Sequence, residues 1–306
     1  MKTYNYYFAA FGAFFIWGFF SLALRPLQNY PSLDILFYRV FMSAVAMLLI
    51  NIVFRREKVR NNWVLFSSLK PKEKSRIVLL TLGGSFLLTA NWFVFIFVVN
   101  HVNVKAASLA YLICPIVTTF FAFVILKEKL SKSQWIAVLL SVFSCVLLSM
   151  NHFQDIFYSF IVATTYALYL VSQRKNSEID KFIILTIQLL FTAIVILPFY
   201  PFYSGNIPAE PVFYICLAII VVLFTIIPLF LNLYSLKGIN SSTVGIMMYI
   251  NPIINFLIAF FYFNEEVNSI QLLSYFLIAL SIIIFNKKLL FAKKSKPLLP
   301  NCRTIK

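Results

Sequence analysis

The sequence predicts an all-α integral membrane protein with ten transmembrane helices, arranged as two inverted five-helix repeats. Three observations support this prediction. Hydrophobic residues make up 61% of the 306 positions. They are gathered in ten long blocks, and positive charges alternate between the segments that separate the blocks. A soluble chain of this length could not hide so much apolar surface, so lipid must surround it.

Each apolar block is long enough to approach or cross a bilayer, which takes about 20 residues in a helix that rises about 1.5 Å per residue. The segments between the blocks are short and polar or turn-forming, apart from a longer polar separator at 55–76. The predicted spans are 4–24, 33–54, 77–99, 104–126, 133–150, 154–173, 182–203, 212–235, 242–263 and 270–286.

Positive residues indicate the orientation. Of the 26 Lys and Arg residues, 23 lie in the N-terminus, the even-numbered connections or the C-terminal segment, and the odd-numbered connections carry only Arg25 and Lys105. Because positive loops stay in the cytoplasm, both termini are expected there, which requires an even number of spans. The net charge of +16 therefore reflects topology and predicts no nucleic-acid partner. The basic tail offers a second interpretation, as a patch for anionic lipid.

An internal repeat relates the two halves at an offset of 137 residues. Aligning Pro115 with Pro252 at this offset gives further matches without a gap, among them Glu128 with Glu265, Gln134 with Gln271 and Ser144 with Ser281. We therefore expect repeats over 1–150 and 151–290, followed by a cytoplasmic tail over 291–306. Because a repeat unit with five spans crosses the membrane an odd number of times, its second copy begins on the other side and has the opposite orientation. Inverted repeats are typical of secondary transporters, whose substrate site lies near the midplane between the halves.

The two aligned prolines fall inside predicted spans. Each removes one backbone hydrogen bond and should bend its helix. Carbonyls freed in this way should face protein or a wet cavity, because lipid offers them no partner. The kinks at Pro115 and Pro252 either improve packing or line a cavity, and their recurrence in both halves favours the cavity.

Several stretches carry a resemblance to a known family: Phe15–Gly18, Ile35–Val40, Gly83–Gly84, Asn91–Ile96, Val98–Val102, Ala107–Tyr111, Leu126–Lys129, Gln134–Val138, Thr225–Leu229, Ser242–Gly245 and Tyr249–Pro252. They resemble the EamA family of the drug/metabolite transporter (DMT) superfamily, specifically its RarD-like permeases, over nearly the whole chain. The resemblance implies a multi-pass permease of the inner (plasma) membrane with cytoplasmic termini. The glycine that usually precedes the loop glutamate is Lys127 here, and its counterpart is Asn264.

Arg39 is the one clearly intramembrane charge in the sequence. It lies about six residues, or roughly 9 Å, beyond the predicted start of its span. A charge at this depth indicates function by default, although arginine can also snorkel to the interface. Arg39 could hold an anionic group of a substrate in a cavity, or it could pair with Asp34 or with carbonyls.

Polar and aromatic residues within the spans complete the predicted site. In lipid they should face the interior of the bundle, either around a substrate or as hydrogen-bonding contacts between helices. The candidate substrate-binding residues are Trp17, Arg39, Asn91, Trp92, Tyr111, Thr118, Gln188, Asn232, Tyr249 and Asn255.

These features favour a secondary transporter of small organic solutes, such as metabolites, amino-acid-like compounds or drugs, that works by alternating access. A lipid or amphiphile flippase is the alternative, and an intramembrane enzyme is less favoured, because His101 and His152 have no partner at ligand spacing. No cofactor or metal is expected, and the protein should be a monomer or homodimer. The absence of a deep acidic residue in any span favours facilitated diffusion or exchange over a proton relay.

Overall fold

The computed structural model describes residues 4–101, 104–149, 153–205, 207–264 and 266–287, and throughout these ranges every regular element is helical. The fold class predicted from the sequence is therefore confirmed. The tail over 291–306, the side chain of His101 and the counterpart glutamate Glu265 lie outside the part that can be described.

The first half of the chain forms seven α-helices around one short 3-10 turn, Arg25–Leu27. The helices are α1 (Tyr4–Gly18), α2 (Phe20–Leu24), α3 (Ser32–Phe54), α4 (Arg56–Ser68), α5 (Pro71–His101), α6 (Val104–Leu126) and α7 (Lys132–Ser149). The predicted polar separator at 55–76 contains α4 and the first turns of α5. The sequence analysis did not predict a helix in this segment. Short-range polarity indicates that such a segment leaves the membrane, but it does not exclude a helix at the surface.

The second half follows a similar course with more interruptions. Its third span changes from an α-helix to a π-helical stretch, Ile220–Ile226, and back again. A 3-10 turn, Leu197–Phe199, extends its second span. Its helices are α8 (Phe153–Lys175), α9 (Lys181–Ile196), α10 (Tyr200–Tyr203), α11 (Pro211–Ile219), α12 (Ile227–Ser235), α13 (Ser241–Met247), α14 (Ile250–Phe261) and α15 (Ser269–Phe285).

Among the described residues, eight helices or continuous helical runs are long and apolar enough to cross a membrane. The pair α1 and α2, bent by 41° at their junction, makes a ninth candidate if it counts as one span. The remaining predicted span is α15, which is apolar but has only 17 residues. Each of these candidate spans, α15 included, lies where an apolar block was predicted, and the total of ten stays a prediction because α15 is short.

Contacts between distant connections group them at two ends of the bundle. Arg55 forms a salt bridge of 3.1 Å with Asp180, which joins the second and sixth connections. At the opposite end, the Tyr30 hydroxyl donates to Glu210 at 2.9 Å, which joins the first and seventh connections. We call the end that carries most of the positive residues the basic end. This grouping of odd and even connections is the one that the charge alternation predicts.

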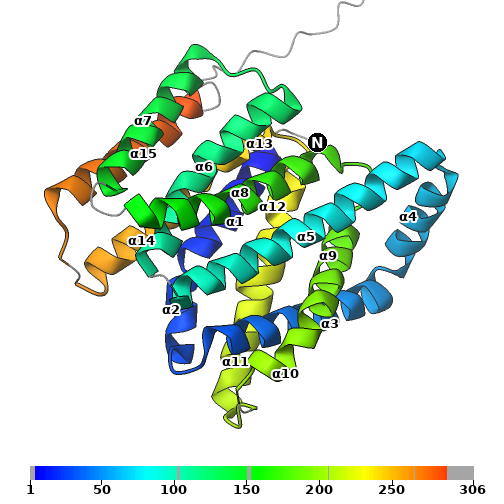
Figure 1. Cartoon of the computed structure of the whole chain (residues 1–306). Helices are drawn as coiled ribbons and strands as arrows, with labels where there is room; N and C mark the ends of the chain where they lie inside the picture. Colours follow the sequence, from blue (N-terminus) through cyan, green and yellow to red (C-terminus); the bar gives the residue numbers. More distant parts are fainter. Residues whose placement is uncertain (1–3, 102–103, 150–152, 206, 265, 288–306) are drawn as a thin grey trace, which may run out of the picture.

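The helices α7 and α15 lie side by side at one edge of the bundle (Figure 1). Their contact surface includes serine side chains from both helices, and small residues let two helices approach closely in a membrane. The Ser141 hydroxyl donates to the Ser281 hydroxyl at 3.0 Å, and the Ser144 hydroxyl donates to the Ser274 carbonyl at 2.7 Å. The aligned pair Ser144 and Ser281 therefore lies at a contact between equivalent helices of the two halves.

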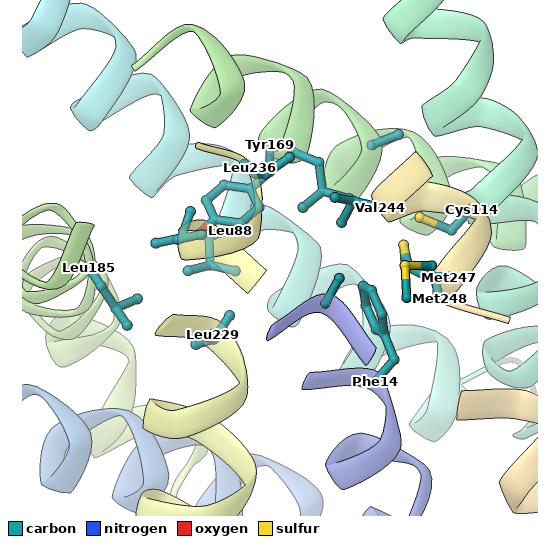
Figure 2. Close-up of a cluster of buried hydrophobic side chains, with 14 of the residues drawn as sticks. Phe14, Leu88, Cys114, Tyr169, Leu185, Leu229, Leu236, Val244, Met247 and Met248 are labelled. Atoms are coloured by element: carbon teal, nitrogen blue, oxygen red, sulfur yellow. The ribbon is translucent and has the colours of Figure 1, made fainter. Parts of the chain in front are cut away.

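The first helix of each half packs mainly against the other half. Helix α8 lies against α5 and α6, and α1 lies against α12 and α14. The largest buried cluster fills the space between them and draws Phe14, Leu88, Tyr169, Leu229 and Met247 from five different helices (Figure 2). The two halves therefore share one core and do not form two separate ones.

The 137-residue relation is visible in the backbone. Among non-glycine residues in the described part, only Lys127 and Asn264 have positive φ, at 55° and 52°. These two residues are equivalent in the alignment and end equivalent helices, one at the basic end and one at the opposite end. The left-handed conformation, usually taken by glycine at a helix end, is thus kept although both glycines are replaced.

The glutamine match of the repeat also has a structural explanation. The Gln134 side chain accepts from the backbone N–H of Ser131 at 2.9 Å, at the start of α7. Its equivalent, Gln271, does the same for Asn268 at 3.2 Å, within a complete capping box at the start of α15. Both glutamines satisfy amides that a helix leaves unpaired at its first turn.

We predict that Lys127→Val destabilises the protein and that Lys127→Gly does not. A left-handed conformation costs an L-residue about 1–2 kcal/mol, and a β-branched side chain tolerates it least. The valine variant should melt about 2–8 °C lower in detergent, at about 2–4 °C for each kcal/mol. Lys129→Val, two residues on, is the control, and equal losses in both valine variants would contradict the explanation.

Candidate functional site

Arg39 lies on α3 between two aromatic rings. Its guanidinium carbon is 4.7 Å from the ring centroid of Trp92 on α5 and 5.7 Å from that of Phe20 on α2. The Tyr111 phenol on α6 is near enough to interact electrostatically with it. Three of the predicted site residues, Arg39, Trp92 and Tyr111, are thus brought together. We call them, with Phe20, the Arg39 cluster.

The accessibility of this cluster is uneven. The Arg39 side chain is half-buried, and its Nε atom is buried without a hydrogen-bond partner. Tyr111 leans on Phe95, with ring centroids 5.5 Å apart, and keeps 39% of its surface exposed. The cluster therefore combines a charge that lacks a partner with accessible aromatic surface, inside a segment that is otherwise apolar.

Trp17 approaches the cluster from α1 but has a partner in the second half of the chain. Its indole N–H donates to the Phe224 carbonyl at 2.9 Å. Phe224 lies four residues before Pro228, so its carbonyl would receive the N–H of residue 228 in a regular α-helix, and proline has none. The Trp17 indole therefore supplies the Phe224 carbonyl, which lies in the π-helical stretch, with a hydrogen-bond donor in place of the missing N–H of residue 228.

Three predicted polar residues converge on α8. Asn91 donates to the Val162 carbonyl at 2.8 Å, Asn232 donates to the Tyr166 hydroxyl at 2.8 Å, and Gln188 accepts from the Tyr169 hydroxyl at 3.1 Å. All three are buried. They act here as hydrogen-bonding contacts between helices, and the structure does not place them beside Arg39. The Gln188 Nε2 and Asn232 Oδ1 atoms remain without partners.

Thr118 and Tyr249 are fully buried by packing. Gly245 on α13 approaches Thr118 so closely that an added Cβ would lie 2.9 Å from the threonine side chain. Tyr249 belongs to a second buried cluster with residues of α7 and α15, and its hydroxyl has no hydrogen-bond partner.

The two repeat-related prolines, Pro115 and Pro252, differ from each other in their effect on the helix. Helix α6 continues through Pro115, whereas α13 ends at Met247 and α14 begins at Ile250, just before Pro252.

Asn255 forms part of a small polar chain between α2 and α14. The Ser21 hydroxyl donates to Asn255 at 2.9 Å, and the Asn255 amide donates to Asn251 at 2.6 Å. These contacts connect the α1–α2 segment with α14. The alignment pairs Asn255 with Thr118, but their surroundings differ because Thr118 is sealed by Gly245.

Sequence analysis did not assign a role to Glu128, which the structure shows at a contact between the halves. Its carboxylate accepts from the backbone N–H groups of Ser241 at 2.8 Å and Ser242 at 3.1 Å, and from the Ser242 hydroxyl at 2.5 Å. A carboxylate at the first turn of α13 satisfies amides that the helix leaves free and complements its dipole. The match between Glu128 and Glu265 was the signal that could have found it.

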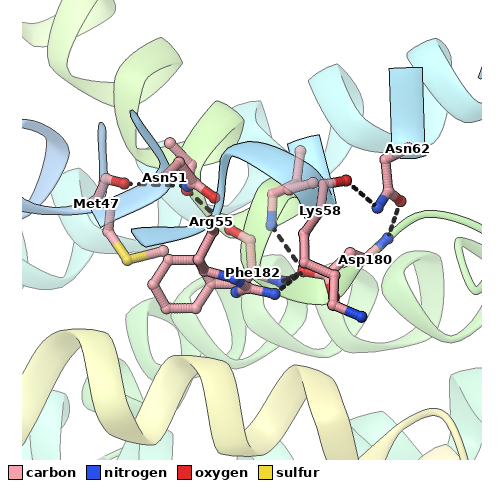
Figure 3. Close-up of polar contacts among 9 residues, drawn as sticks. Met47, Asn51, Arg55, Lys58, Asn62, Asp180 and Phe182 are labelled. Atoms are coloured by element: carbon pink, nitrogen blue, oxygen red, sulfur yellow. Dashed lines mark hydrogen bonds and ion pairs between the residues drawn. The ribbon is translucent and has the colours of Figure 1, made fainter. Parts of the chain in front are cut away.

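Asp180 organises a second contact at the basic end (Figure 3). Its carboxylate caps α9 by accepting from the N–H of Phe182 at 2.9 Å, and its own N–H donates to the Asn62 side chain on α4 at 2.9 Å. The Arg55 guanidinium binds the same carboxylate and covers the Phe182 ring at 4.4 Å.

Beside the Glu128 contact, a polar cleft of about 290 Å³ opens between Tyr7, Lys129, Gln134, Asn240 and Asn286.

No group of three or more His, Cys, Asp or Glu side chains that could hold a metal ion occurs within the described ranges. Within these ranges the buried polar groups are mostly amides and hydroxyls, together with the Asp34 carboxylate and the Lys181 ammonium, and the Arg39 side chain is half-buried.

Comparison with known proteins agrees with this architecture. The model of the EamA-like transporter family matches residues 5–150 and again 155–287. The chain belongs to the EamA-like transporter family. A Bacillus subtilis protein named as an uncharacterized transporter, YojE, is 30% identical over 276 residues, which are 89% of this chain and 90% of that protein. The RarD protein of Escherichia coli is 26% identical over 280 residues, covering 90% of this chain and 92% of its own.

A solved crystal structure shares the fold of this EamA protein with a TM-score of 0.73. It covers 95% of this chain and 98% of its own at 13% identity, so the likeness concerns the fold alone. Together, the family match and the names of its relatives identify the chain as a membrane transporter with a RarD-like sequence.

We predict that Glu128→Gln lowers stability by about 1.5–3 kcal/mol, the usual worth of hydrogen bonds to a charged group. The amide keeps one acceptor oxygen but loses the charge that complements the start of α13. Thermal unfolding in detergent measures the change. Glu178→Gln is the matched control because Glu178 is exposed in another connection at the same end. The explanation fails if both variants melt alike.

Replacing Trp17 with phenylalanine should cost about 1 kcal/mol, because the Phe224 carbonyl loses a neutral hydrogen bond while the ring volume is largely kept. The apparent melting temperature should fall by about 2–4 °C. Trp63→Phe, on the exposed face of α4, should leave it unchanged. An unchanged melting temperature in the Trp17 variant would show that Phe224 finds another donor.

Proposed function

We propose that this EamA protein is a secondary transporter that moves small organic solutes by alternating access between two inverted repeats over 1–150 and 151–290. The observation that carries the proposal is the Arg39 cluster, a charge without a partner, flanked by accessible aromatic surface, inside an apolar bundle. Intramembrane ionisable residues generally mark a substrate or ion pathway.

Contacts between the repeats support a motion of this kind. At the basic end, Glu128 of the first repeat holds the start of α13 in the second, and the Arg174 guanidinium binds the Leu236 carbonyl. Such contacts are local and polar, so they can break and form again without unpacking the shared core. We propose that they close the basic end in the present conformation.

The positive-inside pattern supports a location in the inner (plasma) membrane, with the basic end and both termini in the cytoplasm. The protein is proposed to act as a monomer or homodimer, surrounded by lipid. A reporter fused to the C-terminus that is active only in the cytoplasm tests this orientation directly, and activity only from a periplasmic or extracellular reporter would reverse it.

A flippase for lipids or amphiphiles is the second candidate. The wide lipid-accessible surface of the helices is common to both functions. Comparing metabolite uptake and efflux between cells with and without the protein separates the two. A change in soluble metabolites supports the transporter, whereas a change confined to lipid distribution across the membrane supports the flippase.

We predict that transport needs no pH gradient. Among the described acidic residues, none lies deep in a span: Asp34 is at the start of α3, and its carboxylate accepts from the Gly205 N–H at 3.1 Å. Proteoliposomes loaded with a solute found by the cell comparison should exchange it for labelled external solute at equal internal and external pH. Exchange that appears only when a proton gradient is imposed would contradict this prediction.

A further inference from the structure

Arg39 has no protein partner for its charge. Among the described residues, its guanidinium forms no hydrogen bond and no ion pair. The Nε atom is buried, while the two terminal nitrogens keep accessible surface. A desolvated charge without a counter-ion is unfavourable, and a ring face compensates only part of that penalty.

The nearest acidic candidate is occupied elsewhere. Asp34 lies on the same helix, five residues before Arg39, but both of its carboxylate oxygens accept from the Gly205 N–H, at 3.1 and 3.2 Å. Besides the two ring faces, the Tyr111 phenol, which carries no charge at neutral pH, is near enough to interact with the guanidinium. The guanidinium therefore carries one positive charge, and its N–H groups are available to donate to a ligand.

The surroundings of that charge are flat and apolar. Trp92 and Phe20 flank the guanidinium. Tyr111 and Phe95 continue the aromatic surface, and Phe224 of the second half approaches Phe20 with ring centroids 5.8 Å apart. A planar apolar group can pack against these rings, while an oxyanion reaches the donors of the arginine in a forked arrangement.

We propose that the Arg39 cluster binds organic monoanions, namely a carboxylate attached to a flat, apolar body, and that Arg39 determines this specificity. A single cation balances a single negative charge. The proposal rests on the proposed transport function and specifies its substrate class.

The test measures binding to the purified full-length protein in detergent by thermal shift. Two matched pairs of probes differ only in charge: benzoate with benzamide, and indole-3-acetate with indole-3-acetamide. At least one carboxylate should raise the melting temperature, because a ligand stabilises the state it binds. Its amide should give less than a third of that shift. Equal shifts from acid and amide, or no shift from either carboxylate, overturn the proposal.

Variants separate a specificity role from a structural one. Arg39→Met should weaken carboxylate binding at least about tenfold and should melt no lower than the unsubstituted protein without ligand, because it removes a partly buried charge that has no counter-ion. Arg25→Met is the control, since Arg25 also covers a ring, that of Phe263 at 4.4 Å, but outside the cluster. A marked loss of stability in unliganded Arg39→Met, or an unchanged carboxylate shift, contradicts the proposal.

The two proposals can fail separately. If solutes exchange across proteoliposomes but neither carboxylate binds, the transport function stands and the anion site is wrong. If a carboxylate binds through Arg39 but no solute exchanges, the site is correct and the transport proposal is wrong.

Discussion

A polar group inside a bilayer has no water to bind, and this constraint explains most of the specific contacts in the molecule. Helix ends and interruptions release backbone groups, and side chains from elsewhere in the chain satisfy several of them. Glu128 takes amides at the start of α13, and the Trp17 indole satisfies the Phe224 carbonyl near Pro228. The buried Lys181 ammonium donates to the carbonyls of Gln173 and Asn176, at the end of α8. Many of these partners are far apart in the chain, so the same contacts also assemble the bundle.

Arg39 is the exception that gives the constraint functional meaning. Among the other buried polar side chains discussed here, the charged ones, such as Lys181, are bound by carbonyls or by helix ends. Within the described part of the chain, the guanidinium of Arg39 has only ring faces and a neutral phenol around it. This charge is therefore left without an ionic or hydrogen-bonding partner there, and it lies beside accessible aromatic surface.

Sequence patterns were sufficient for the spans because bilayer thickness sets their length and composition. The 137-residue repeat likewise predicted equivalent helices, and it is supported by the shared left-handed residues Lys127 and Asn264. Helix α4 was missed because a polar helix at a surface has no long apolar signature. The sequence could nominate Thr118, Gln188 and Tyr249 as polar groups inside the bundle. It could not show that packing seals them, because helical periodicity does not reveal which neighbour a face meets.

The cross-packing of the first helices has a consequence for how the protein is made. Helix α1 leaves the ribosome well before two of its principal neighbours, α12 and α14, have been synthesised. At about 5–20 residues per second, α1 waits for tens of seconds in the membrane before its permanent contacts exist. During that time it must persist as a separate helix in lipid, its Trp17 indole still without the Phe224 carbonyl. Biogenesis of this protein therefore depends on α1 being stable before these contacts form, and on later helices that close a core to which α1 contributes.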